Sequence, residues 1–171
     1  MEQIYCESIG KIKQDKAKLE KALKVKLSFS GKREEIKGDA ISEYLCLEII
    51  EAINLGFTAE QALLLCDEEL IFEKINIKDI TKRKDLGVIR ARIIGTKGKT
   101  RKYLQNLSDC FICLHDNTVG IIGRTDDIKK TIQAITSLIQ GSKQSKVYSY
   151  LEREKTKEKE KSLDEDLGLR K

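Results

Sequence analysis

The pattern of apolar and polar residues repeats in the two halves of the chain. In each half, strand-like alternation and helix-like spacing follow one another in the same order. In the first half, Val25 to Phe29 alternates apolar and polar residues, as a half-buried strand does. A long apolar helical stretch follows, and Gly56 is well placed to end it. Thr58 and Gln61 then form a capping box that predicts another short helix. The first half is thus predicted to contain a strand, a charged helix, two strands and a long helix, at residues 3–8, 15–23, 25–29, 34–36 and 40–55.

The second half repeats this order, with two helices before its strand pair. Thr125 is expected to cap the last helix, and Asp126 and Asp127 suit the positive end of that helix's dipole. A turn at 116–117 is expected to join the two strands as a hairpin. The predicted elements are a strand at 71–77, helices at 86–94 and 99–108, strands at 110–115 and 118–122, and a helix from 125 that ends at Gly141.

The repeated order indicates an α+β protein built from two tandem βααββα units. On this interpretation residues 1–66 and 67–151 are two domains, and the alternative is a single α+β domain. A further helix is expected to begin near Ser145, and residues 152–171 are almost all charged. This charged C-terminal tail is either a solvated extension of that helix or disordered.

Composition argues against a membrane-spanning or secreted protein but does not by itself indicate a function. The chain has 171 residues and a net charge of +5, which does not by itself indicate nucleic-acid binding. The sequence has no apolar run of about 18 residues, so no membrane span is predicted. Met1 to Gly10 lacks a secretory pattern, so the five cysteines are expected to be reduced and the protein cytoplasmic.

The segment from 93 to 102, Ile-Ile-Gly-Thr-Lys-Gly-Lys-Thr-Arg-Lys, carries the strongest functional pattern. Gly95 and Gly98 allow a tight turn between two helices and a close approach by another backbone. The first amides of the second helix have no partner within the helix and form an anion site. Basic residues surround this loop: Arg90, Arg92, Lys97, Lys99, Arg101 and Lys102.

A phosphodiester backbone fits this combination of bare loop, free amides and positive charge. Thr96 and Lys97 are expected to line the clamp, with the bases over an apolar floor of Ile93, Ile94 and the strand after Ser108. The base edges are expected to bond to backbone groups there. The alternative is a plain glycine turn with solvated lysines.

The loop and its flanks resemble a known family. Arg92 to Arg101 is similar to the glycine loop of KH domains, and more narrowly to the "partner of Nob" family of small-ribosomal-subunit assembly. The segments 56–65 and 147–153 resemble the joining segment and the end of that family's second KH domain. The resemblance implies binding near the 3′ end of small-subunit ribosomal RNA, alongside the endonuclease that makes the final cut, without cutting RNA itself.

The first half departs from the family's pattern. Alignment places Gly10-Lys11-Ile12-Lys13 at its loop, where Lys13 replaces the second glycine, and the helix before it is nearly lost. The first half is therefore interpreted as a degenerate KH-like domain with little grip on RNA, although the lysines at 11, 13, 16, 18 and 21 remain alternative phosphate contacts.

Two other patterns are set aside. Cys110 and Cys113 have the spacing of a redox or zinc pair, but residues three apart on a strand point to opposite faces. His115 is interpreted as a surface residue at a strand end, and Tyr148 and Tyr150 as packing residues of the last helix rather than base-stacking ones.

The sequence therefore predicts a monomeric, non-enzymatic protein that binds single-stranded RNA, with no cofactor, metal or membrane. One alternative is another RNA-binding role with the same loop chemistry. A second is a scaffold that recruits a nuclease or translation factor and touches RNA weakly, and a third is a thiol oxidoreductase that uses Cys110 and Cys113.

Overall fold

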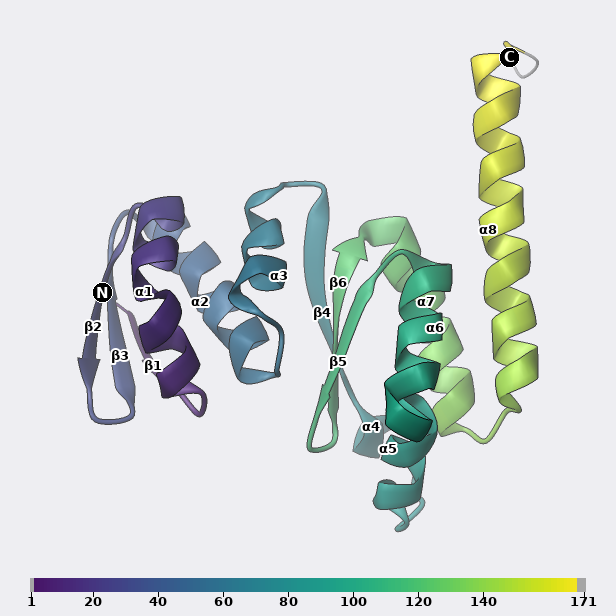
Figure 1. The fold of residues 1–171 in the computed structure, drawn as a ribbon, viewed down its shortest axis with the longest axis horizontal. Helices are drawn as coiled ribbons and strands as arrows, with labels where there is room; N and C mark the ends of the chain where they lie inside the picture. Colours follow the sequence, from purple (N-terminus) through teal and green to yellow (C-terminus); the bar gives the residue numbers. More distant parts are fainter. Residues whose placement is uncertain (1, 169–171) are drawn as a thin grey trace.

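The computed structural model describes residues 2–168 and shows an α+β protein with two small antiparallel sheets (Figure 1). The N-terminal half, residues 2–66, has the strand order β1-β3-β2. Its elements are β1 (Glu2–Tyr5), α1 (Ile9–Leu23), β2 (Lys26–Ser30), β3 (Arg33–Lys37), α2 (Ala40–Asn54), α3 (Ala59–Leu63) and a 3-10 turn (Leu64–Cys66).

The C-terminal half, residues 67–168, has the equivalent strand order β4-β6-β5. In register, Phe72 and Phe111 lie on either side of Ile122 in the central strand. The elements are β4 (Leu70–Asn76), α4 (Ile77–Ile80), α5 (Leu86–Ile94), a 3-10 turn (Thr96–Gly98), α6 (Lys99–Ser108), β5 (Phe111–His115), β6 (Thr118–Arg124), α7 (Thr125–Ile139) and α8 (Gln144–Asp166).

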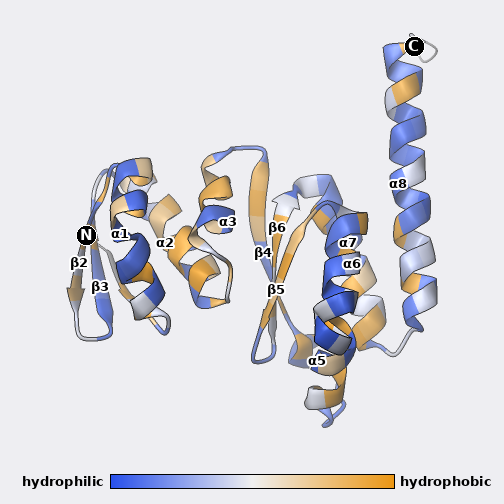
Figure 2. Cartoon of the chain, viewed as in Figure 1, coloured by the Kyte–Doolittle hydropathy of each residue, from blue (hydrophilic) through white to orange (hydrophobic). Residues whose placement is uncertain are grey.

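The second sheet is covered on both faces, which joins the two halves. Phe72, Cys113 and Ile122 pack into the apolar cluster of α1, α2 and α3, whereas Ile112 and Ile121 face the cluster formed with α5, α6 and α7. Figure 2 shows hydrophobic residues on α2, α3 and the second sheet, where they face one another. The second sheet is consequently held between helices from both halves of the chain.

The N-terminal half differs from the predicted βααββα order. Helix α1 begins at Ile9 rather than near residue 15, so Gly10 to Lys13 forms its first turns and not a loop. Ile12, Leu19 and Leu23 are all buried on one face of this helix. Ile12 lies two helical turns before Leu19, so it shares the buried face of α1 and belongs to the core. This half therefore has a single helix between its first two strands.

Helix ends were predicted well where a local capping pattern decides them. The capping box of Thr58 and Gln61 is confirmed, with both reciprocal bonds at 3.2 Å. Thr125 does not cap α7, because Arg124 occupies the N-cap position and Thr125 is already helical. Asp126 and Asp127 do lie in the first turn of α7.

Helix α8 continues to Asp166 and leaves the body of the protein partway along. Val147 and Leu151 bury its first turns, and Lys155 then bonds to Asp109 at 3.1 Å. An ion pair between Lys130 and Glu158 ties the next turn of α8 to α7. Beyond this point the helix projects alone and is mostly hydrophilic (Figures 1 and 2). Within residues 2–168, no helix has the length and apolar character needed to span a bilayer.

One carboxyl group is buried in the N-terminal core. Glu34 on β3 has no exposed surface; the Cys6 thiol donates to its Oε2 at 3.0 Å, and Oε1 has no hydrogen-bond partner among the described residues. Burial raises the pKa of this carboxyl above its ordinary value of 4.5, against smaller opposing effects of the Cys6 hydrogen bond and the Lys16 charge. The folded state therefore holds the Glu34 proton more tightly than the unfolded state does.

This proton makes the stability depend on pH. The contribution of the Glu34 proton to the stability of the folded state is complete below pH 4.5. It is lost as the pH rises through the raised pKa of Glu34, because the folded state must then carry a buried charge. Glu34→Gln stays neutral, so its stability relative to the native protein should improve with rising pH, on the order of 1 kcal/mol. Urea unfolding of both proteins from pH 4.5 to pH 8 tests this. A difference that is constant over this range would show that Glu34 does not titrate there.

Candidate nucleic-acid interface

The loop between α5 and α6 is a tight turn with three residues at positive φ. Gly95 has φ 73° and ψ 175°, Lys97 has φ 52°, and Gly98 has φ 73°. The Gly95 N–H donates to the Ala91 carbonyl at 2.8 Å, and the Gly98 N–H donates to the Gly95 carbonyl at 3.2 Å. Helix α5 ends at Ile94 and α6 begins at Lys99, with four residues between them, as the glycine pattern predicted.

Gly95 and Gly98 are needed in the loop for different structural reasons. A Cβ on Gly95 would lie 2.1 Å from Thr100 Oγ1 and 2.6 Å from Thr100 Cβ, so the buried Thr100 side chain occupies that space. A Cβ on Gly98 would meet nothing within 4 Å. Gly95 therefore permits packing inside the protein, whereas Gly98 leaves a bare stretch of backbone open to an approaching ligand.

A residue from α8 supports the loop from behind. Gln144 Nε2 donates to Thr100 Oγ1 and to the Arg92 carbonyl, both at 3.2 Å. These bonds tie the end of α5 to the start of α6. Sequence reasoning missed Gln144, which lies more than 40 residues beyond both of its partners in the chain.

The outer surface of the loop is positive and uncapped. The side chains of Thr96, Lys97, Lys99 and Lys102 are exposed. The ion pairs found within residues 4–168 join other lysines and arginines, not these three lysines. Within the described residues no side chain caps the N-terminus of α6, although the Lys99 N–H donates to the Thr96 carbonyl. The positive end of the helix dipole there favours an anion.

Some predicted site residues serve the protein itself. Arg90 Nη1 donates to Asn117 Oδ1 at 2.7 Å, and Arg92 Nη2 donates to the Ser142 carbonyl. Both side chains are half-buried and brace the surroundings of the loop, and their contact with RNA stays a prediction. Ile93 is fully buried and is not part of a groove floor, whereas Ile94 is 36% exposed.

The next turn of α6 faces the open edge of β5. Gln105 Oε1 accepts the Ile112 N–H at 2.7 Å, and Arg101 lies one turn earlier on the same helix. Burial raises the pKa of the Cys113 thiol, and the positive charges of Arg101 and Lys11 partly oppose that effect. The side of α6 that carries Arg101 and Gln105 therefore leads from the loop to the edge of β5.

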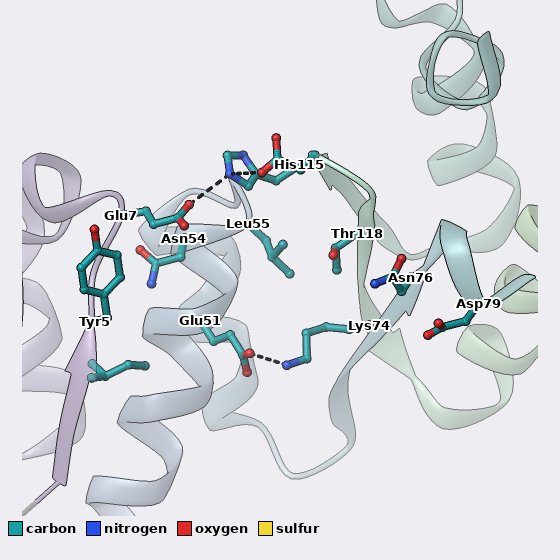
Figure 3. A pocket seen from close by; sticks show the side chains of 12 residues that line it. Tyr5, Glu7, Glu51, Asn54, Leu55, Lys74, Asn76, Asp79, His115 and Thr118 are labelled. Carbon is teal, nitrogen blue, oxygen red and sulfur yellow. Dashed lines mark hydrogen bonds and ion pairs between the residues drawn. The ribbon is translucent and has the colours of Figure 1, made fainter. Parts of the chain in front are cut away.

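A second hollow lies between the halves and has the opposite character (Figure 3). It encloses about 640 Å³, and its walls carry the carboxylates of Glu7, Glu51, Asp79 and Asp116 with one lysine, Lys74. Lys74 pairs with Glu51 across the hollow. Its surplus of negative charge repels phosphates, so this hollow is not part of the proposed RNA path.

His115 lies at the end of β5, as predicted, and its Nε2 is 3.2 Å from Glu7 Oε2. The contact joins the two halves at the rim of the hollow. Cys110 and Cys113 are both buried and unpaired, and they belong to clusters on opposite faces of the sheet. Burial raises the pKa of both thiols, which keeps them protonated and poorly nucleophilic.

The chain is similar to known proteins over most of its length. A family model described as a eukaryotic type KH domain (KH-domain type I) matches residues 71–156. A KH domain-containing protein of Methanocaldococcus jannaschii, MJ0443, is 31% identical over 156 residues, which cover 87% of this chain and 69% of that protein. The pre-rRNA-processing protein PNO1 of Yarrowia lipolytica is 37% identical over 107 residues, 61% of this chain.

The chain spans only 42% of the Yarrowia protein's length. Among solved structures, the a/eIF2alpha-aDim2p-rRNA complex from Pyrococcus horikoshii OT3 contains a chain that is 32% identical, with a TM-score of 0.81. That match covers 91% of this chain and 94% of the Pyrococcus chain. Residues 71–156, which the family model matches, include the Gly95–Gly98 loop, Arg101 and Gln105.

Proposed function

Because the chain belongs to the family of KH-domain proteins that includes pre-rRNA-processing PNO1 and archaeal Dim2p, we propose that it binds single-stranded RNA through the Gly95–Gly98 loop. The observation that carries the proposal is the loop itself. It combines open backbone at Gly98, a helix N-terminus without a side-chain cap, and exposed lysines that form no ion pair within residues 4–168. A KH loop of this type grips about four nucleotides by their backbone.

Thr96 and Lys97 line the clamp in this proposal, and Lys99, Arg101 and Lys102 attract the phosphates that follow. Ile94 and the β5 edge supply the surface beneath the bases. Arg90 and Arg92 were also expected to contact RNA. We propose that they also support the loop, because their intramolecular bonds reach the hairpin and the segment before α8.

The RNA that we propose is small-subunit ribosomal RNA near its 3′ end. The Pyrococcus relative was solved in a complex with rRNA, and the Yarrowia relative is a pre-rRNA-processing protein, which supports a ribosomal target. In this role the protein presents the RNA to the maturing endonuclease and does not cut it. The proposal retains a monomer in the cytoplasm, and five unpaired cysteines suit a reducing compartment.

We also propose that the N-terminal half is a degenerate KH-like domain, so that the chain divides into 1–66, 67–151 and a charged tail at 152–171. Both halves have the same strand order, which supports descent from one unit. The N-terminal half has a continuous α1 where the C-terminal half has its glycine loop. Without that loop it lacks bare backbone for phosphates and contributes mainly by covering the second sheet.

A salt titration tests whether phosphates carry the binding. With about four to six phosphate contacts, log affinity should fall with log salt at a slope of about −3 to −4 for a single strand. Fluorescence anisotropy with a labelled single-stranded RNA that matches the rRNA 3′ end gives this slope. A slope near zero would contradict the clamp.

The same experiment weighs the scaffold alternative. Ile41 and Tyr44 on α2 are 80% and 65% exposed, so this face of the N-terminal half offers an apolar contact for a protein partner. If the folded protein binds no RNA at low salt, the clamp proposal fails and recruitment of a protein through such a surface becomes the better interpretation.

A further inference from the structure

The outer face of the N-terminal sheet is open, unlike either face of the second sheet. Helices α1 and α2 pack on its inner face, against Leu27 and Ile36. In Figure 1, β2 and β3 lie at one end of the molecule, and none of the described elements lies beyond them. The second sheet buries the corresponding face against the N-terminal half. The N-terminal sheet therefore keeps free a face that its counterpart uses for packing.

The side chains on this outer face are polar and mostly positive. Residues of β2 and β3 alternate between the buried inner face and the outer face. Lys32, in the turn between the two strands, lies 5.8 Å from the centroid of the Tyr5 ring. The residues that point outward are Lys26, Ser28 and Ser30 in β2 and Arg33, Glu35 and Lys37 in β3. Lys26, Lys32, Arg33 and Lys37 are called the sheet cations below, and they favour a polyanion as the partner of this face.

Two of the sheet cations face each other across the strands. Lys26 lies directly opposite Lys37 in the register of β2 and β3. Like charges at directly opposite positions destabilise a sheet. Glu35 Oε2 is 3.8 Å from Lys37 Nζ and offsets part of the repulsion. A bound anion would remove the rest.

The other sheet cations are not neutralised within the protein. The ion pairs found within residues 4–168 include neither Lys26, Lys32 nor Arg33. All three side chains belong to exposed residues. Their charge is therefore available to a ligand.

The cations lie at the two ends of the face, with hydroxyl groups between them. Arg33 and Lys37 are four residues apart on β3, which separates their Cα atoms by about 13 Å. Ser28 lies opposite Glu35 in the middle of the face, and Ser30 lies opposite Arg33. An RNA duplex displays ribose 2′-hydroxyls between its two phosphate backbones, across a wide and shallow minor groove. The order of cation, hydroxyl and cation on the sheet matches this order of phosphate, ribose and phosphate.

We propose that the outer face of the N-terminal sheet is a second RNA site, which binds the minor-groove side of an RNA duplex. The sheet cations neutralise phosphates of both strands, and the Ser28 hydroxyl bonds to a 2′-hydroxyl, a group that DNA lacks. The site lies on the opposite side of the sheet from α1, so it does not need the glycine loop that this half lacks. It goes beyond the proposed clamp, which grips a single strand, and does not depend on it.

Fluorescence anisotropy with three labelled probes tests this proposal. The probes are a blunt RNA duplex of about 16 base pairs, a DNA duplex of the same sequence, and a uridine decamer for the clamp. The native protein should bind the RNA duplex about fivefold more tightly than the DNA duplex, the effect of one hydrogen bond. Ser28→Ala should reduce this preference and leave the affinity for the DNA duplex as it is.

Lys26→Gln combined with Arg33→Gln tests the charges. This variant should lower affinity for the RNA duplex on the order of tenfold. The slope of log affinity against log salt should become shallower by roughly two, because each neutralised phosphate contributes about one unit. Affinity for the uridine decamer should stay nearly the same, because distant sites act independently.

A matched control removes the same charge elsewhere. Lys129→Gln combined with Lys159→Gln changes exposed lysines on α7 and α8, and it should leave the affinity for the RNA duplex nearly unchanged. Urea unfolding checks the fold of the sheet variant. Lys26→Gln with Arg33→Gln should be at least as stable as the native protein, because it removes the repulsion between Lys26 and Lys37.

The outcomes separate this inference from the clamp. If the native protein binds the decamer but not the RNA duplex at low salt, the sheet site fails and the clamp stands. If the RNA duplex binds but the decamer does not, the clamp fails and the sheet site stands. Equal affinity for the RNA and DNA duplexes, or equal weakening by the sheet variant and its matched control, overturns the proposal. Binding of polyglutamate in place of the RNA duplex, weakened by the sheet variant, would also overturn it and identify an acidic protein as the partner.

Discussion

Replacing Thr96 and Lys97 together by aspartate is expected to lower affinity for single-stranded RNA on the order of 100-fold. The change removes one positive charge and adds two negative ones where phosphates would lie. Each unit of charge at such a contact is worth about 1 kcal/mol in water, which gives about 3 kcal/mol in total. Anisotropy with the rRNA 3′-end RNA measures the loss.

The backbone should tolerate this change. Lys97 has φ 52° and ψ 30°, a left-handed conformation in which aspartate and asparagine are among the more frequent side chains. The matched control is therefore Thr96→Asn with Lys97→Asn, which has the same shape without the negative charges. We expect this control to lose about fivefold, through the single lysine charge. If the aspartate and asparagine variants bind equally well, phosphates do not lie at this loop.

Gly95→Ala is expected mainly to lower the stability of the protein, and Gly98→Ala mainly to lower its affinity for RNA. At Gly95 the new Cβ would overlap Thr100, and ψ 175° at positive φ is a region almost restricted to glycine. Strain and overpacking together should cost about 3 kcal/mol of unfolding free energy. Urea unfolding measures this loss.

Gly98→Ala should cost only about 1 kcal/mol, the penalty of an alanine in the left-handed region, because its Cβ points into open space. That methyl group would instead stand where the RNA backbone approaches, so we expect about a tenfold loss of affinity at a temperature where the protein is fully folded. In Gly95→Ala, by contrast, the Thr100 side chain cannot easily move away from the new Cβ, because Gln144 is hydrogen-bonded to its hydroxyl. Equal destabilisation by the two variants would refute these separate roles.

Much of the fold was predictable because its signals act over a few residues. The bounds of α5 and α6 agree with the sequence prediction, since glycine ends one helix and begins the next. The hairpin turn at Asp116 was also predicted, and Asp116 has φ 50°. Helix α4 was missed, because four residues show no hydrophobic period.

The candidate loop was visible in the sequence, but the surroundings of the loop were not. Arg90 and Arg92 looked like further cations of the rim, since a sequence shows charge and not the carbonyl or amide that a charge meets. Gln105 has no motif, and its meaning comes from a strand edge seven residues away that folding brings beside it.

Apart from the short helix α4, the sequence by itself determined the secondary structure of the C-terminal half, the glycine loop and its basic character. These depend on helical period, capping and the conformational freedom of glycine, all of which are local. Only the tertiary structure decided that α1 absorbs the expected first loop, that Gln144 supports the second, and that Gln105 covers the β5 edge. The physical reason is that hydrogen-bond partners and burial depend on which elements pack together, and packing joins residues whose separation in the chain leaves no local pattern.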